Sequence, residues 1–279
     1  MTSSGEGIEQ TIAATDGFEL ATTIYGSGDD VVMLSAATAT PRQFYKSFAM
    51  FLADEGHTVV TYDYRGIGES RPESLRGFRG SMSDWGLLDM QGVLDWISDE
   101  YAPTTLFAVG HSVGGQVTGM LTGADRITAM ATVSAQSGYW GLQGDGEVAK
   151  MRIAAHFVMP PVTRLFGYFP WSKFSSAQDL PKDAALQWAS WCRDPDYILG
   201  DDALPLERYQ DFTAPVLAYS IDDGLGHREV GRGNDVGLPQ RRVSAPSTQR
   251  RRHRLTRTLR LLPPKVRTNM ATNPGLATR

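Results

Sequence analysis

The stretch "AVGHSVGGQVTG" (residues 108–119) decides how the rest of the sequence is interpreted. Ser112 lies between Gly110 and Gly114, directly after an apolar run that starts at Thr105. This pattern predicts a buried strand, a sharp turn with the serine at its apex, and a helix behind it. The residues two positions away must be very small because such a turn strains the backbone. The helix N-terminus would offer amide hydrogens to a developing negative charge, so the pattern favours an attacking serine.

The Gly-x-Ser-x-Gly spacing is by itself a weak signal in a chain with 29 glycines. The alternative is a glycine-rich turn in which the serine has no chemical role. The position of the motif between a strand and a helix favours the nucleophile over this alternative.

Apolar segments on both sides of the motif alternate between strand and helix patterns. Residues 7–14 and 18–25 predict an antiparallel hairpin. Further strands are expected at 31–37, 57–66, 104–110, 127–136 and 214–223, and helices at 41–56, 81–101 and 112–123. In the first helix we expect an apolar face made of Phe44, Phe48, Met50 and Phe51. This alternation predicts an α/β fold with a mostly parallel central sheet flanked by helices.

The segment 138–210 interrupts the alternation and is rich in aromatic residues. We interpret it as a helical cap inserted between two strands of a core that consists of residues 1–137 and 211–223. Most of its aromatic side chains are expected to pack the cap onto the core, and the others to favour an apolar ligand. They are Trp140, Phe157, Phe166, Tyr168, Trp171, Trp188 and Trp191.

Composition excludes several classes of protein. The single cysteine, Cys192, is expected to be a buried thiol. No apolar run is long enough to span a membrane, and residues 1–17 lack the pattern of a signal peptide, so we expect a cytoplasmic protein. We expect no metal and no cofactor.

The end of the chain, from 224 to 279, differs in composition from the part before it. This tail holds 13 of the 27 Lys and Arg, two acidic residues and none of the 27 aromatic residues. The range 1–223 therefore carries a net charge of −15. We find no convincing strand or amphipathic helix after Asp223, and the composition of the tail is typical of disorder.

The range 1–223 resembles the α/β-hydrolase fold, and within it a bacterial subgroup of predicted serine hydrolases. The resemblance is carried by residues 34–72 ("LSAATATPRQFYKSFAMFLADEGHTVVTYDYRGIGESRP"), "VGHSVGGQ", "FGYFPW" and "PVLAYSIDD". It implies that Ser112 is the nucleophile and that the amide of Val113 is one oxyanion donor. It places the second donor at Ala37, with Ala36 as the next choice. The triad acid would be Asp223, with Asp222 as the alternate; a pair of turn-forming aspartates is the competing interpretation. In the same family the turn "DYRGIGES" is structural, so Asp63 and Arg65 are expected to brace it.

The catalytic histidine is not recognisable. Three histidines precede Asp223 and do not fit the Ser–Asp–His order: His57, His111 and His156. His227 follows the acid too closely, and His253 lies in an arginine-rich segment that cannot hold an imidazole in place. We hypothesise that the tail is read in a shifted frame. Moved by one base, codons for "RLLPPKVR" (residues 260–267) can encode Gly-Phe-Phe-Arg-Pro-Lys-Tyr, and the triplet straddling Thr258 and Leu259 can encode histidine.

The sequence therefore predicts a serine hydrolase of an ester, thioester or related acyl substrate, impaired in this form. The expected partner is a small, apolar acyl compound. Two alternatives stay open. One is a non-catalytic protein with the same fold, and the other is a weak binder of nucleic acid or an acidic partner through the basic tail. Nucleic acid is the less favoured partner because no aromatic residues accompany the basic ones.

Overall fold

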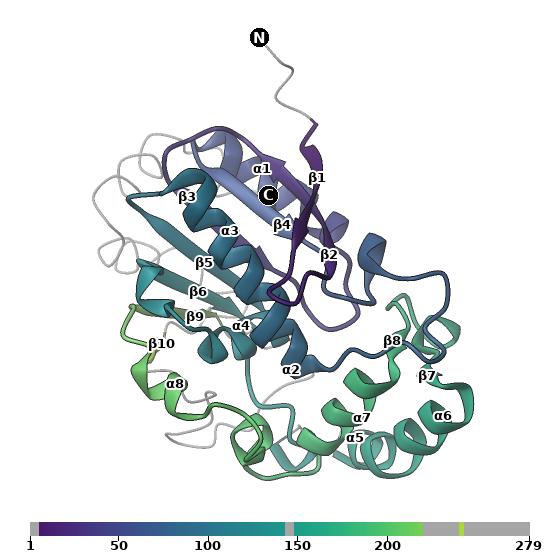
Figure 1. Ribbon diagram of the computed structural model, residues 1–279. Helices are drawn as coiled ribbons and strands as arrows, with labels where there is room; N and C mark the ends of the chain where they lie inside the picture. The colour runs from purple at the N-terminus through teal and green to yellow at the C-terminus, as the bar shows by residue number, and fades with distance from the viewer. Residues whose placement is uncertain (1–5, 143–147, 220–239, 243–279) are drawn as a thin grey trace, which may run out of the picture.

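A computed structural model describes residues 6–142, 148–219 and 240–242, the last segment by its backbone alone. In these ranges eight strands form one sheet in the order β1-β2-β4-β3-β5-β6-β9-β10 (Figure 1). The strands are β1 Ile8–Ala13, β2 Glu19–Tyr25, β3 Val31–Ser35, β4 Thr58–Tyr62, β5 Leu106–His111, β6 Ala129–Val133, β9 Val216–Tyr219 and β10 Gln240–Arg242. The strands from β4 to β10 pair in parallel, whereas β1 and β2 pair antiparallel with each other and β2 with β4.

The central strands form where the sequence runs apolar without interruption. Every residue of β3 and of β4 is buried, as expected of parallel strands covered on both faces. The mostly parallel α/β architecture predicted from the sequence is confirmed, including the hairpin of β1 and β2. One prediction is wrong: β10 pairs in parallel with β9 although no strand was expected after Asp223. Strand pairing uses backbone groups, which every residue type apart from proline supplies in full.

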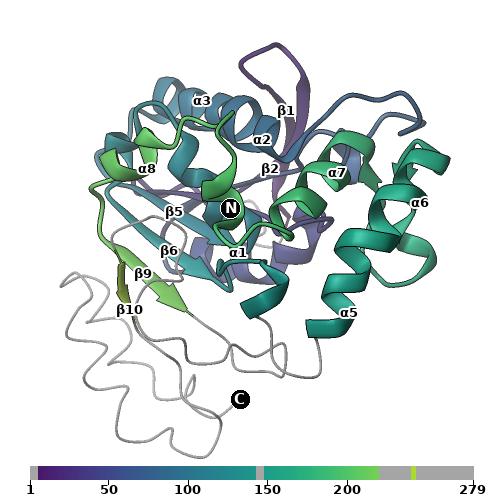
Figure 2. The same cartoon turned by 90° about the horizontal axis from the view of Figure 1, so that it is seen from below.

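Helices pack on the two sides of the sheet (Figure 2). On one side α3 contacts β1 and β3, and α4 contacts β5 and β6; on the other side α1 contacts β4 and β2. The elements of this part are η1 Arg42–Tyr45, α1 Lys46–Asp54, η2 Gly68–Ser70, α2 Met82–Asp84, η3 Trp85–Met90, α3 Gln91–Tyr101, α4 Val113–Gln116, η4 Val117–Met120 and η5 Ala124–Arg126. The apolar stripe predicted for residues 81–101 is largely buried, with Trp85, Val93 and Ile97 in the core.

The apolar face predicted for this helix is largely exposed, although Met50, one of its four residues, packs against the core. Phe44, Phe48 and Phe51 are 71%, 44% and 37% exposed, and Ala49 is the residue of α1 that the core buries. The rings of Phe48 and Phe51 stack on each other, with centroids 6.4 Å apart. A helix was therefore predicted correctly in this segment, but the described residues do not cover the three phenylalanine rings.

Between β6 and β9 lies the region predicted as the cap, residues 138–210, and its last helix ends one residue later at Asp211. Its elements are η6 Trp140–Leu142, α5 Val148–Ile153, η7 Ala154–Val158, α6 Met159–Phe166, β7 Tyr168–Phe169, η8 Trp171–Lys173, β8 Leu180–Pro181, α7 Lys182–Trp191, η9 Tyr197–Gly200 and α8 Glu207–Asp211. The cap is mainly helical, but β7 and β8 form a small antiparallel pair that the sequence did not predict. The last helix, α8, contacts η4, where Tyr209 packs against Gly119. The boundaries of the cap as a domain stay a prediction.

Candidate active site

Ser112 lies at the turn between β5 and α4, at the carboxyl end of the parallel strands. Its backbone angles are φ 50° and ψ −119°. A positive φ is strained for a residue with a side chain and persists where the surrounding structure enforces it. The Ser112 side chain is half-buried, and its amide donates to the Val133 carbonyl at 2.9 Å, which ties the turn to β6.

The glycines on both sides of Ser112 are required by close packing. A Cβ on Gly110 would lie 2.5 Å from Gly115 of α4, and a Cβ on Gly114 would lie 2.5 Å from the Ser35 carbonyl oxygen of β3. Both distances are too short for real atoms, so the helix can approach the sheet this closely because these positions lack side chains. The Gly-x-Ser-x-Gly spacing thus has the structural cause that the sequence suggested.

Val113 is the first residue of α4. The first amides of a helix have no acceptor within that helix. In the described ranges the Val113 amide also donates to no loop carbonyl and to no side chain. Behind Ser112 there is therefore an N–H group without an acceptor among the described residues, and its role as an oxyanion donor stays a prediction.

Ala37, the predicted second donor, has an amide that is already engaged. It donates to the hydroxyl of Tyr45 at 2.9 Å. The same hydroxyl lies 2.8 Å from Nδ1 of His111, the residue before Ser112. Burial raises the pKa of Tyr45 to about 12 and lowers the pKa of His111, so both groups are neutral near pH 7. The alternate donor, Ala36, is buried beside Ala37.

Tyr45 is held by an anchor three residues earlier, Arg42. The Arg42 amide donates to Asp63 at 2.6 Å, and its buried guanidinium forms ion pairs with Asp63, Glu9 and Glu69. Neither Arg42 nor Tyr45 was predicted from the sequence as part of the site. The available signal was a charged residue inside a segment interpreted as an amphipathic helix.

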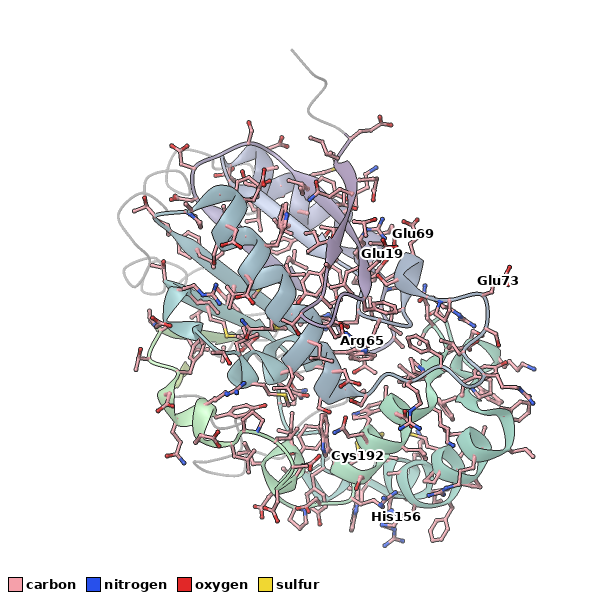
Figure 3. The ribbon with its side chains drawn as sticks, viewed as in Figure 1. Glu19, Arg65, Glu69, Glu73, His156 and Cys192 are labelled. Atoms are coloured by element: carbon pink, nitrogen blue, oxygen red, sulfur yellow. The ribbon has the colours of Figure 1, made fainter. Side chains whose placement is uncertain are left out.

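Asp63 and Arg65 brace the turn after β4, as predicted. Asp63 also accepts from the Glu69 amide at 2.9 Å. Arg65 pairs with Asp89 at 2.7 Å and with Asp16 at 2.8 Å, and Figure 3 shows it inside the body of the molecule. Burial raises the pKa of Asp89 to about 7 despite this pairing. Both residues are therefore used in structural contacts.

The cap is fastened to two loops at the carboxyl ends of the strands. The backbone N–H of Gln178 donates to the carbonyl of Ala39, in the loop after β3, at 3.0 Å. Its side-chain oxygen accepts from the Gly68 amide at 2.7 Å, in the turn after β4. The loop that carries Ala37 is therefore in direct contact with the cap.

Most of the cap aromatics contact one another. Trp171 stacks on Trp188 with centroids 5.3 Å apart, and Trp191 is buried and donates from Nε1 to Asp201 at 2.8 Å. Phe157 is 71% exposed. The rest lie in ring or cation–π contacts: Trp140 with Arg152, and Phe166 with Tyr168. This arrangement agrees with packing as their main role.

Cys192 lies inside the cap (Figure 3), where burial raises the pKa of its thiol to about 12. The prediction of a buried thiol is confirmed. Figure 3 also shows His156 at the outer edge of the cap, where its Nδ1 lies 2.9 Å from the Arg152 carbonyl. His57 precedes β4, at the amino end of the parallel strands. In the described ranges no hydrogen bond joins either histidine to Ser112.

The predicted triad acid and the histidines after it lie outside the described residues. This applies to Asp223, Asp222, His227 and His253, and to the tail as a whole. Within the described ranges, no cluster of three His, Cys, Asp or Glu side chains could hold a metal ion. In the same ranges, no helix has the length and apolarity that a membrane span requires.

Comparison with known proteins agrees with this geometry. Residues 30–157 match the family model described as the alpha/beta hydrolase fold. No curated protein matches the chain by sequence.

Solved structures share the fold at low sequence identity. An esterase of Pyrococcus furiosus is 15% identical with a TM-score of 0.52, and the match covers 96% of this chain and 91% of that one. A putative acyltransferase of Salmonella enterica is 19% identical with a TM-score of 0.54, covering 88% and 90%. A hydrolase of Pseudomonas aeruginosa is 18% identical with a TM-score of 0.52, covering 86% and 90%.

The strand order, the strained serine at the end of β5 and the matched family model all point to one superfamily. The chain therefore has the α/β-hydrolase fold.

Proposed function

We propose that this protein is a serine hydrolase that cleaves an ester, thioester or related acyl compound with Ser112 as the nucleophile. The observation that carries the proposal is the conformation of Ser112, at φ 50° and ψ −119°, beside the available amide of Val113. A strained backbone at the carboxyl edge of a parallel sheet is typical of a functional residue. In the reaction, the Ser112 oxygen attacks the acyl carbon and the alcohol or thiol leaves. Water then hydrolyses the acyl-enzyme.

This mechanism also needs a general base and a triad acid, and the candidates for both lie outside the described residues. We assign the acid to Asp223, or else to Asp222, and no histidine of this chain to the base. A chain without its base retains the oxyanion donors and the binding site, so its activity is reduced by several orders of magnitude. The shifted reading frame after residue 223 is our explanation for the missing histidine.

The substrate class follows from the cap. The cap contains half-buried aromatic rings such as Trp171 and Trp188, and the Gln178 contacts join it to the loops after β3 and β4. An apolar acyl or aromatic group is the ligand that such rings favour.

Labelling with a fluorophosphonate probe tests the nucleophile directly. We expect a covalent adduct on Ser112, located by mass spectrometry of the digested protein, and its loss in Ser112→Ala. Ser134 is a matched control, because it is also a half-buried serine with a positive φ, 51°, at the end of the next strand. Ser134→Ala should label like the unchanged protein. Because the missing base slows the attack on the probe, the incubation is long and the probe concentration high. An adduct that survives Ser112→Ala, or no adduct under these conditions, contradicts the proposal.

A further inference from the structure

We propose that the hydroxyl of Tyr45 is the second donor to the oxyanion at Ser112, in place of the Ala37 amide. This inference rests on the proposed function. It starts from an observation about space: the Tyr45 oxygen occupies the acceptor position of the Ala37 N–H, 2.9 Å from the nitrogen. A substrate oxygen cannot take that position while the Tyr45 hydroxyl is there, because two oxygen atoms cannot accept from one N–H at the same point.

Tyr45 is held too firmly to be displaced without cost. It is 8% exposed, and its ring meets Phe44 and His111 edge-on, with centroids 5.1 Å and 5.9 Å apart. It ends the short helix that Arg42 begins, and Arg42 is fixed by its ion pairs. Displacement would break the hydrogen bonds to Ala37 and His111 and would leave buried polar groups unpaired.

The direction of the hydrogen bonds leaves Tyr45 with a proton to donate. The Ala37 N–H can only donate, so the Tyr45 oxygen accepts from it. If His111 Nδ1 is unprotonated, the Tyr45 O–H points to it at rest. It can then turn about the C–O bond towards an oxyanion, which is a stronger acceptor than a neutral imidazole. If His111 Nδ1 carries the proton, it donates to the Tyr45 oxygen, and the Tyr45 O–H can donate to another acceptor.

In both cases the Ala37 amide contributes through Tyr45. A hydroxyl that accepts a hydrogen bond is polarised and becomes a better donor. The bond to the substrate oxygen strengthens as negative charge develops there, so Tyr45 would stabilise the transition state more than the bound substrate. No proton is transferred in this step; the O–H remains on Tyr45.

The rate of fluorophosphonate labelling at Ser112 tests this role. In Tyr45→Phe we expect the second-order rate constant to fall about 10²-fold, the usual cost of losing one oxyanion donor. Tyr209→Phe is the matched control: its hydroxyl is as deeply buried and, among the described residues, has no hydrogen-bond partner. We expect that control to label at the rate of the unchanged protein.

Two results would overturn the proposal. Equal labelling of Tyr45→Phe and the unchanged protein would show that the hydroxyl is not a donor. Faster labelling would show that Tyr45 covers the Ala37 amide, which would then be the donor. A separate failure is recognisable: if labelling of the unchanged protein does not depend on Ser112, the proposed function falls and this inference with it.

A second variant covers the case that Tyr45→Phe does not fold. Replacement of Tyr45 by 3,5-difluorotyrosine keeps the ring and makes the hydroxyl a stronger donor. At a pH where the hydroxyl stays protonated, we expect labelling to accelerate several-fold. An unchanged or lower rate in a folded variant contradicts the role of Tyr45, and circular dichroism checks the folding of each variant.

Discussion

The two faces of the central sheet differ in how completely they are buried. On the side of α4, Leu106, Ala108, Met130 and Val216 are all at most 4% exposed. On the side of α1, their neighbours in β5, β6 and β9 are half-buried, so that burial alternates along each strand. These neighbours are Phe107, Val109, Ala129, Ala131, Val133, Leu217 and Tyr219.

The register shows that the half-buried residues form one surface. Leu34 pairs with Val109, Val109 with Ala131, and Ala131 with Leu217, so all four lie on the same face. Leu34 in β3 is buried, whereas the other three are not. Burial on this face is therefore complete near α1 (Figure 2) and incomplete towards β9.

Parallel sheets are normally covered by helices on both faces. Among the described residues, no helix covers β5, β6 and β9 on the side of α1. The exposed rings of Phe48 and Phe51 lie on this same side, in α1. The less buried part of this face lies in β5, β6 and β9, and β9 comes shortly before the change of composition that follows residue 223.

The largest expected effect comes from shifting the reading frame by one base after codon 223. If the frame hypothesis is right, the restored chain gains the histidine and a covering helix. Hydrolysis of a p-nitrophenyl ester should rise by at least about 10³-fold. Binding of the dye ANS to exposed apolar surface should fall. The same frame shift combined with Ser112→Ala is the control and should stay inactive. A restored chain that is no more active, and still binds the dye, would end the hypothesis.

A matched pair of leucines sharpens the comparison of the faces. Leu106→Ala, on the covered side, should lower the free energy of unfolding by about 3 kcal/mol, within the range for buried leucines. Leu217→Ala, on the half-buried side, should lower it by about 1 kcal/mol, because less apolar area is lost. Urea unfolding followed by tryptophan fluorescence measures both. Equal losses would show that a further segment covers Leu217.

The smallest effect is expected on the surface of α1. Phe48→Ser removes a ring that is 44% exposed, and surface changes of this kind usually alter the free energy of unfolding by less than about 0.5 kcal/mol. Ala49→Ser, at a fully buried neighbour in the same helix, is the comparison and should cost more. Unfolding by urea again gives the values. If Phe48→Ser instead destabilises the protein as strongly as the loss of a buried ring does, the ring is covered in solution.

Much of the fold could be predicted because several of its strands lie in apolar segments of the sequence. The segment "VVMLS" is fully buried as β3, and the small residues around Ser112 have the packing reason that the motif implied. Local patterns of this kind need no knowledge of distant partners.

The parts that could not be predicted depend on distant partners. Tyr45 meets Ala37 and His111, which is 66 positions away, and Arg42 meets Glu9, 33 positions away. No periodicity in residues 41–56 reports these contacts. The exposure of Phe48 and Phe51 was also missed because a helical apolar stripe shows that a face exists, without showing that anything covers it.

The contacts of Gln178 have a consequence for any movement of the cap. This residue hydrogen-bonds to the backbone after β3 and to the backbone after β4, so a displacement of the cap at this point would break both bonds. Any opening of the cap at this point would pull on the segment that carries Ala37.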